Sequence, residues 1–196
     1  MILVIDTSSA RSAVALLGPR GDVVAEELAD SGRTFSVPAR VMAITAGQTI
    51  KTVMVATGPG SFTGLRSGVS FGLGLAIGLR IPICPLSTLA LQAARSDTPV
   101  TALAEAGRGR VYRLPPGGEP AVGEASDVDG DLPAVGWLRP STEAALRAAG
   151  VTLLDPAQLR TLGAAAATLL GSAREVAYGS LKLEYMYGFS APSRQG

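Results

Sequence analysis

The chain has 196 residues, enough for one large domain or two smaller ones that share a core. Apolar residues make up 47% and charged residues 17%, and the mean hydropathy is +0.32, which indicates a folded globular protein and excludes the disordered class. Seventeen basic and sixteen acidic residues give a formal charge of +1 without a long run of one sign, so any contact with RNA is expected to be indirect.

Two scarce residue types exclude further classes. The chain has no histidine, which excludes serine–histidine catalysis, and its one cysteine, Cys84, cannot complete the usual zinc sites or a disulfide framework. The chain opens on a strand without a basic segment and apolar leader, so we expect a cytoplasmic protein. The charge-free run between Arg66 and Arg80 would form about 20 Å of helix, too short for a bilayer, so no transmembrane segment is expected.

The first half of the chain predicts three short strands in an antiparallel meander, followed by helices that alternate with strands. Ser36 as N-cap, Pro38 in the first turn and Gly47 at the end mark the first helix. The predicted elements are strands over residues 1–6, 12–17 and 22–28, a helix over 36–46, a strand over 52–57, a helix over 62–79, a strand over 81–86 and a helix over 87–94.

A second and shorter set of similar elements follows the polar junction Ser96 to Pro99. Its predicted elements are strands over residues 101–106, 111–114 and 134–138, a helix over 141–149, a strand over 151–155 and a helix over 156–172. The repetition predicts an α/β protein with two ribonuclease H-like halves in tandem, mixed sheets flanked by helices, and a reduced second half. The expected domains are residues 1–96 and 97–196.

Residues 56–68, ATGPGSFTGLRSG, form a glycine-rich turn between a strand and a helix, where phosphates commonly bind. The spacing departs from the Walker A loop, because Gly64 comes one position late and Leu65-Arg66 stands where lysine is required. It departs from the dinucleotide fingerprint in the same way. The carboxylates of Asp127 to Asp131 begin like a calcium loop, but Leu132 and Leu138 stand where glycine and glutamate belong, which favours a solvated turn.

The helix over 62–79 has no properly polar face. Projected at 100° per residue, Gly64, Gly68 and Gly72 lie on one flank with apolar side chains, and the remaining arc holds only Ser67, Ser70, Gly74 and Gly78. Five glycines in a helix are locally unfavourable, so close packing should offset them, either inside the domain or at a protein interface. We expect the interface, in which case Gly68→Leu or Gly72→Leu should break pairing without unfolding the monomer.

Three segments resemble a known family. MILVIDTSSARSAVAL at the start, GPGSFTGLRSGVSFGLGLAIGL from residue 58 and PLSTLALQA from residue 85 resemble the N-terminal half of the TsaB family, also called YeaZ. This family is the non-catalytic component of the bacterial system that makes threonylcarbamoyladenosine in tRNA. The resemblance covers residues 1 to about 94 and is faint from residue 97 to 196.

The resemblance implies an actin/Hsp70/sugar-kinase-like fold, a homodimer when alone, and pairing with the catalytic paralogue TsaD. The pair is then expected to recruit the ATPase TsaE. It implies no cofactor, metal or catalytic residue in this chain, with ATP and magnesium supplied through the partner complex, and tRNA contacted only indirectly. Phe62 and Arg66 are expected at the rim of the contact. The residues predicted for the partner interface are Arg33, Arg40, Ser61, Phe62, Leu65, Arg66, Gly68, Val69, Gly72 and Leu73.

Asp6, Thr7 and Ser8 end the first strand, where nucleotide-binding members of this fold place an acid for metal and phosphate. They are candidate nucleotide or phosphate ligands, although the local alternative is that they satisfy N–H groups of the turn. The alternative function is therefore a small kinase or ATPase of the same fold that uses Asp6, Glu105 and magnesium. A peptidase function has no base, nucleophile pair or metal site to support it.

Overall fold

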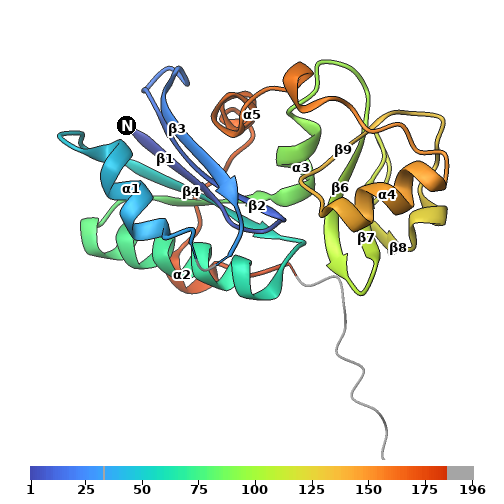
Figure 1. The fold of residues 1–196 in the computed structure, drawn as a ribbon. Coiled ribbons are helices and arrows are strands. Elements are labelled where there is room, and N and C mark those ends of the chain that lie inside the picture. The colour runs from blue at the N-terminus through green and yellow to red at the C-terminus, as the bar shows by residue number, and fades with distance from the viewer. Residues whose placement is uncertain (33, 185–196) are drawn as a thin grey trace, which may run out of the picture.

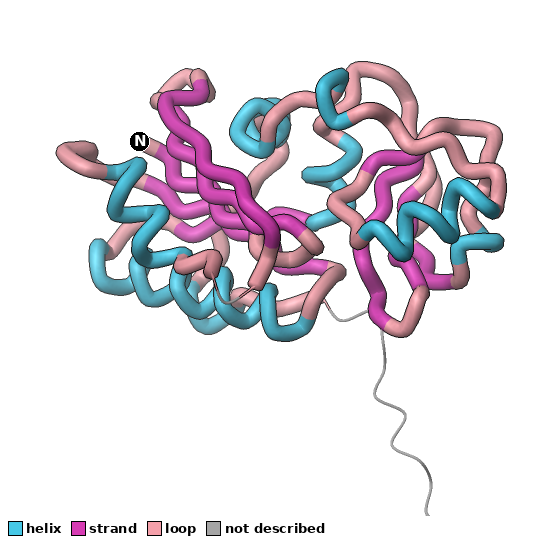
Figure 2. The backbone as a smooth tube through the Cα atoms, viewed as in Figure 1, coloured by secondary structure: helices cyan, strands magenta, loops and turns pink. Residues whose placement is uncertain are grey.

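The computed structural model describes residues 1–32 and 34–184 and contains two β-sheets, each flanked by helices (Figures 1 and 2). The elements of the first half are β1 (Ile2–Asp6), β2 (Arg11–Leu17), β3 (Val23–Asp30), α1 (Val37–Thr45), β4 (Thr52–Gly58), α2 (Phe62–Leu79), β5 (Ile83–Ser87) and α3 (Thr88–Ala93). The predicted elements of this half are all confirmed. The expected N-cap Ser36 accepts a hydrogen bond from the first turn of α1, and Ser87 does the same at the start of α3.

The first sheet has the strand order β3-β2-β1-β4-β5. Strands β1, β2 and β3 form the predicted antiparallel meander, and β4 and β5 add in parallel beside β1. The central strands β1 and β4 are runs of apolar residues because both faces of the sheet are covered. Helices α1 and α2 cover one face, and α5 (Leu162–Leu169) covers the other.

The second half repeats this order in a smaller sheet. Its strands lie in the order β8-β7-β6-β9, with β9 parallel to β6. Its elements are β6 (Thr101–Gly107), β7 (Arg110–Leu114), β8 (Ala121–Gly123), the 3₁₀ turn η1 (Ala125–Asp127), β9 (Ala134–Val135), α4 (Pro140–Ala148), the 3₁₀ turn η2 (Pro156–Gln158), α5 and the 3₁₀ turn η3 (Tyr178–Ser180). The predicted α/β class with two ribonuclease H-like halves and a reduced second half is confirmed.

Several predictions for the second half were wrong in detail. The third strand is β8, which the sequence analysis missed, and residues 134–135 form the fourth strand, preceded by η1 where the first half has α1. Residues 151–155 contribute one bridge, Leu153 to Ala134, instead of a strand. Gly136, directly after β9, lies so close to the Leu103 carbonyl that a Cβ would be 2.5 Å from its oxygen, so this position requires glycine. The helix predicted over 156–172 is shorter than expected. Its first residues form the 3₁₀ turn η2, and only α5 is α-helical.

Each half contributes a helix to the core of the other, and α3 also packs on the first sheet through Leu91. Leu89 of α3 packs with Ala102, Ala104 and Tyr112 of the second sheet. Leu162 and Ala166 of α5 pack on the first sheet. Each sheet therefore depends on a helix from the other half of the sequence, and the predicted division at residue 96 stays a prediction.

Glu26 fastens α5 to the first sheet. Its two carboxylate oxygens accept hydrogen bonds from the N–H groups of Leu162 at 3.0 Å and Gly163 at 2.8 Å, in the first turn of α5. These N–H groups have no partner within the helix, and a carboxylate also interacts favourably with the helix dipole there. The neighbouring Glu27 points to the opposite face of β3, where it pairs with Arg40 of α1.

Helix α2 is long and apolar enough, by length and composition, to cross a membrane. It has 18 residues and a mean hydropathy of 1.2, and 28% of that window is buried inside the protein. Core helices of folded domains pass the same test, and α2 packs on β4 and β1 as such a helix does. The expectation that the chain has no transmembrane segment stays a prediction.

The Glu26 contact predicts a specific loss of stability. Replacement Glu26→Gln removes the charge and one of the two acceptors, and should lower the free energy of unfolding by about 1–2 kcal/mol. The matched control is Glu27→Gln, which breaks a partly exposed ion pair and should cost no more than about 1 kcal/mol. Urea unfolding measures both, and equal losses for the two variants would contradict the assigned role of Glu26.

Candidate functional site

The glycine-rich turn after β4 packs against the loop after β1. The Ser61 N–H donates to the Ser8 carbonyl oxygen at 2.6 Å, and the Thr7 hydroxyl donates to the Gly64 carbonyl oxygen at 2.6 Å. A Cβ on Gly60 would lie 2.3 Å from the Ser8 oxygen, and one on Gly64 would lie 1.9 Å from the Thr7 oxygen. These two glycines therefore permit contact between two segments of the chain.

Asp6 is fully buried beneath this contact. Its Oδ1 accepts hydrogen bonds from the Ser8 N–H at 2.8 Å and the Ser8 hydroxyl at 2.6 Å, the local role that the sequence also allowed. Burial raises the pKa of the Asp6 carboxyl, while the Ser8 hydrogen bonds and the charge of Arg95 oppose this shift. Burial thus favours the neutral acid at Asp6, and a nucleotide-binding role for Asp6, Thr7 and Ser8 stays a prediction.

The inner side of α2 faces β1 and β4, which corrects part of the predicted interface. Leu65, Gly68, Val69 and Gly72 are buried within this chain. A Cβ on Gly68 would lie 2.3 Å from the Thr7 hydroxyl oxygen, and one on Gly72 would lie 3.3 Å from a Val53 methyl carbon. Leucine at either position would disturb the core, so it cannot test pairing as the sequence suggested.

The other predicted interface residues lie at the margins of α1 and α2. Arg40 pairs with Glu27 and lies over the Phe35 ring at 5.7 Å. The Arg66 guanidinium lies 3.8 Å from the exposed Phe62 ring, at the start of α2. Ser61 caps α2 through Gly64, and Leu73 is partly buried in the core below α2. Arg33 lies outside the described residues.

The exposed sides of α1 and α2 form a surface that we call the outer face. Both helices lie on the same face of the first sheet (Figure 1), so their exposed sides point away from it. Met42 is 69% exposed and Ile77 50% exposed, and the charged side chains of these two helices, Arg40 and Arg66, lie near its edge. The outer face consists of Ala39, Met42, Ala43, Ala46, Ser67, Ser70, Gly74, Ile77 and Gly78.

Most of the outer face was not assigned a role from the sequence. The helical projection could have indicated this surface. It places Ser67, Ser70, Gly74 and Gly78 together on the one arc of the helix that carries no large apolar side chains. Only the structure shows which of the three arcs meets the sheet.

A cavity of about 750 Å³ lies between the two halves, beside the glycine turn. Thr7, Ser61 and Arg11 line it from the first half, and Glu105 and Arg139 from the second. Glu105 is nine-tenths buried, and its Oε1 accepts a hydrogen bond from the Arg139 N–H at 2.7 Å. Asp6 and Ser8 do not line this cavity, so the acids of the alternative kinase site, Asp6 and Glu105, do not share it.

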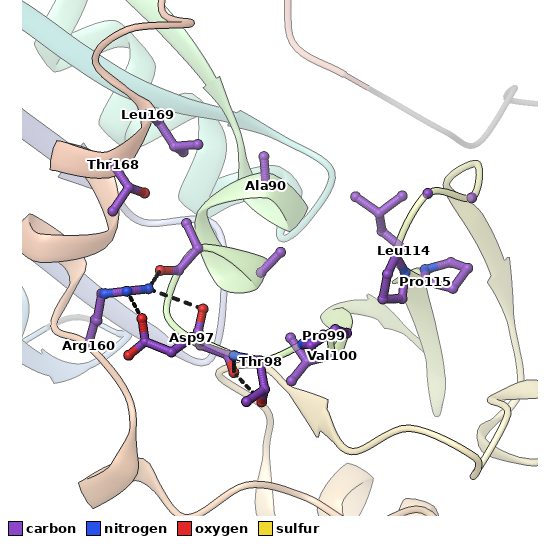
Figure 3. A pocket seen from close by; sticks show the side chains of 16 residues that line it. Ala90, Asp97, Thr98, Pro99, Val100, Leu114, Pro115, Arg160, Thr168 and Leu169 are labelled. Atoms are coloured by element: carbon purple, nitrogen blue, oxygen red, sulfur yellow. Dashed lines mark hydrogen bonds and ion pairs between the residues drawn. The ribbon is translucent and has the colours of Figure 1, made fainter.

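A second hollow of about 680 Å³ opens between α3, the β7–β8 loop, the last residues of α5 and Arg160 before that helix. Figure 3 shows Arg160 on one side, bonded to Asp97 and to the Ala94 and Ser96 carbonyls, and Leu114 and Pro115 on another. These contacts fasten the segment before α5 to the end of α3, a structural role.

The carboxylates of Asp127, Asp129 and Asp131 are exposed, as predicted for a solvated turn, whereas Val128 between them is buried. The Asp131 N–H donates to Asp129 Oδ1 at 3.0 Å, which is local turn chemistry. Among residues 1–32 and 34–184, no three histidine, cysteine, aspartate or glutamate side chains gather in a way that could hold a metal ion.

The fold defines the chain as a tandem ribonuclease H-like protein of the actin/Hsp70/sugar-kinase-like class. A family model described as "TsaD: tRNA N6-adenosine threonylcarbamoyltransferase" matches residues 40–132. The chain is 38% identical over 122 residues to the tRNA threonylcarbamoyladenosine biosynthesis protein TsaB of Bacillus subtilis (strain 168), and 33% identical over 97 residues to the same-named protein of Haemophilus influenzae. Over the matched residues the chain is therefore similar to proteins named TsaB.

The two alignments cover 57% and 47% of this chain and 52% and 41% of the relatives, so the chain spans about half the length of the curated relatives it matches. Among solved structures, YeaZ from Pseudomonas aeruginosa has a TM-score of 0.70 at 22% identity, over 94% of this chain and 99% of that one. A second structure, of an uncharacterized protein with similarity to peptidase YeaZ from P. aeruginosa, has a TM-score of 0.68 at 22% identity, over 95% and 99% of the two chains. These two likenesses show the fold.

Two glycines of α2 should respond oppositely to alanine. Gly64→Ala places a methyl group against the Thr7 carbonyl and should lower the free energy of unfolding by about 3 kcal/mol. Gly74→Ala, on the outer face with nothing within 4 Å of a Cβ, should raise it by about 0.5–1 kcal/mol through helix propensity. Thermal and urea unfolding measure both, and a harmless Gly64→Ala would contradict the packing of the turn.

Proposed function

We propose that this chain is a non-catalytic scaffold subunit in the biosynthesis of threonylcarbamoyladenosine in tRNA. It would pair through the outer face with a TsaD-like catalytic paralogue, and the pair would work with a TsaE-like ATPase. ATP and magnesium would enter through that complex, tRNA would be contacted only indirectly, and the location would be cytoplasmic. The observation that carries this proposal is the outer face itself, a nearly charge-free surface on the two helices beside the family's glycine motif.

The composition of the outer face suits helix packing against another protein. Small residues at Ser67, Ser70, Gly74 and Gly78 let a second helix approach closely, and Met42 and Ile77 supply exposed apolar side chains at its two ends. Exposed apolar patches with a polar margin are typical of protein interfaces. The stacked Phe62 and Arg66 lie where such a margin is expected.

The family comparison indicates which partner fits. The TsaD family model matches residues 40–132, which include most of α1 and all of α2. A paralogue built on the same pattern would present a similar helix pair, and two similar helix pairs can pack about a pseudo-twofold axis. The same geometry lets two copies of this chain pair, so we propose a homodimer that dissociates when the paralogue binds.

The interior of the site supports a scaffold more than a nucleotide enzyme. The glycine turn is packed against Thr7 and Ser8, where a phosphate-binding loop would leave its N–H groups open. Asp6 is buried and held by Ser8. The sequence also contains no histidine that could serve as a base or a metal ligand.

The pairing proposal is tested by a charge on the outer face. Gly74→Arg would bury a guanidinium between the partner helices, and should weaken both the homodimer and the complex with the TsaD-like paralogue at least tenfold, about 1.4 kcal/mol. Light scattering after size exclusion and titration calorimetry with the purified paralogue measure these losses.

The matched control is Gly171→Arg, since Gly171 is also exposed with nothing within 4 Å of a Cβ and follows α5 far along the chain. Unfolding curves should show that neither arginine destabilises the monomer substantially. Normal pairing by Gly74→Arg, or equal losses for both variants, would place the interface elsewhere.

The kinase or ATPase alternative makes a separate prediction. If the chain is a scaffold, calorimetry of the isolated protein with ATP and magnesium should show no saturable binding. Asp6→Asn should leave that result unchanged, because Asp6 lies outside the cavity between the halves. Saturable binding that Asp6→Asn abolishes would favour the enzyme.

A further inference from the structure

A small enclosed cavity of about 170 Å³ lies at the junction of the two halves. Arg11 enters it from the start of β2, Arg95 from the end of α3, Trp137 from the segment after β9, and Glu143 and Arg147 from α4. No residue of α1 or α2 lines it, so it is separate from the outer face and goes beyond the proposed function.

Two buried nitrogen atoms of this cavity have no hydrogen-bond acceptor among the described residues. They are Nε1 of Trp137, a residue that is 5% exposed, and Nε of Arg11, which forms an ion pair with Asp30 Oδ1 at 3.8 Å but no hydrogen bond. Indole and guanidinium nitrogens can only donate, so neither can be satisfied by another donor. Because unpaired buried donors are rare and unfavourable in native proteins, these two atoms indicate an acceptor in the cavity.

The charges around the cavity favour an anionic acceptor. The lining holds the guanidinium groups of Arg11, Arg95 and Arg147 but only one carboxylate, Glu143, which pairs with Arg147 at 3.3 Å. Arg95 is nine-tenths buried, and its guanidinium carbon lies 4.8 Å from the centre of the Trp137 ring. The lining therefore carries a formal excess of two positive charges, although Asp30, outside the lining, pairs with Arg11 at 3.8 Å.

Arg95 is held in place by its neighbours. It donates to the Arg160 carbonyl oxygen and to Gln92 Oε1, at 3.1 and 3.0 Å. Burial lowers the pKa of Arg95 to about 10, so it is charged at neutral pH. The two other acids that interact with it electrostatically are engaged elsewhere, Asp6 with Ser8 and Glu26 with the start of α5.

We propose that this cavity binds a small oxyanion, held by the Trp137 indole N–H and the guanidinium groups of Arg11 and Arg147. The volume is that of about five or six water molecules in the liquid, which accommodates a phosphate or a small carboxylate but is below the ~300 Å³ at which organic-ligand pockets begin. The bound anion would contact both halves of the chain and would stabilise their relative position.

The chain has a single tryptophan, so its fluorescence reports on this cavity. We expect saturable changes in tryptophan emission when the intact protein is titrated with inorganic phosphate, and in a second arm with acetate, at ionic strength held constant by sodium chloride. Tighter binding of phosphate would identify a tetrahedral oxyanion site, and tighter binding of acetate a carboxylate site. No saturable change with either anion would overturn the proposal.

Three variants separate anion binding from a structural effect. Trp137→Phe keeps an aromatic ring, although a smaller one, and removes the N–H, so it should weaken binding about fivefold by calorimetry. Arg147→Gln should weaken binding at least fivefold, whereas Glu143→Gln removes the one negative charge and should strengthen it about threefold. Arg20→Gln, at an exposed position outside the cavity, is the control and should leave the affinity unchanged.

Opposite changes in Arg147→Gln and Glu143→Gln are the signature of an anion, since a loss of packing would weaken binding in both. Thermal melting without added anion verifies that the variants fold. A crystal structure grown in concentrated phosphate that shows only water between Trp137 and Arg147 would overturn the proposal even if the fluorescence changes.

Discussion

The close contact between the glycine turn after β4 and the loop after β1 determines where α2 can lie. Gly60 and Gly64 meet the Ser8 and Thr7 carbonyls at distances that leave no room for a side chain. The hydrogen bonds from Ser61 and Thr7 then fix the start of the helix over the sheet. A nucleotide-binding loop needs the reverse arrangement, with its N–H groups open to a phosphate.

This placement divides the residues of α2 between two tasks. Leu65, Gly68, Val69 and Gly72 complete the core above β1 and β4. The opposite side, with Ser70, Gly74 and Ile77, remains exposed beside α1. Helix α2 resembles a membrane-spanning helix because it has few polar side chains. This composition has two causes, since one side of the helix belongs to the core and the other side consists of small residues.

The second organising feature is the exchange of helices between the halves. Because α3 packs on the second sheet and α5 on the first, the halves cannot separate without exposing both cores. Two further contacts hold these helices in place. Glu26 accepts hydrogen bonds from the first turn of α5. Arg160, just before α5, donates a hydrogen bond to the Ala94 carbonyl oxygen at the end of α3. The buried donors of Trp137 and Arg11 lie at this junction, so the proposed anion site and the proposed docking surface occupy different parts of the fold.

The sequence by itself determined the first half of the fold, because its strands are apolar runs and its helices carry local capping signals at Ser36 and Ser87. It also excluded the histidine-dependent sites, which composition alone decides. The second half was less predictable because β8 and β9 are very short, and such strands form by pairing with β7 and β6 more than by their own propensity. Only the tertiary structure decided which arc of α2 is buried, since helical periodicity gives the angles between side chains but not the direction of the sheet. It likewise decided that the glycines of the turn face Thr7 and Ser8, a contact between residues more than fifty positions apart that local sequence cannot specify.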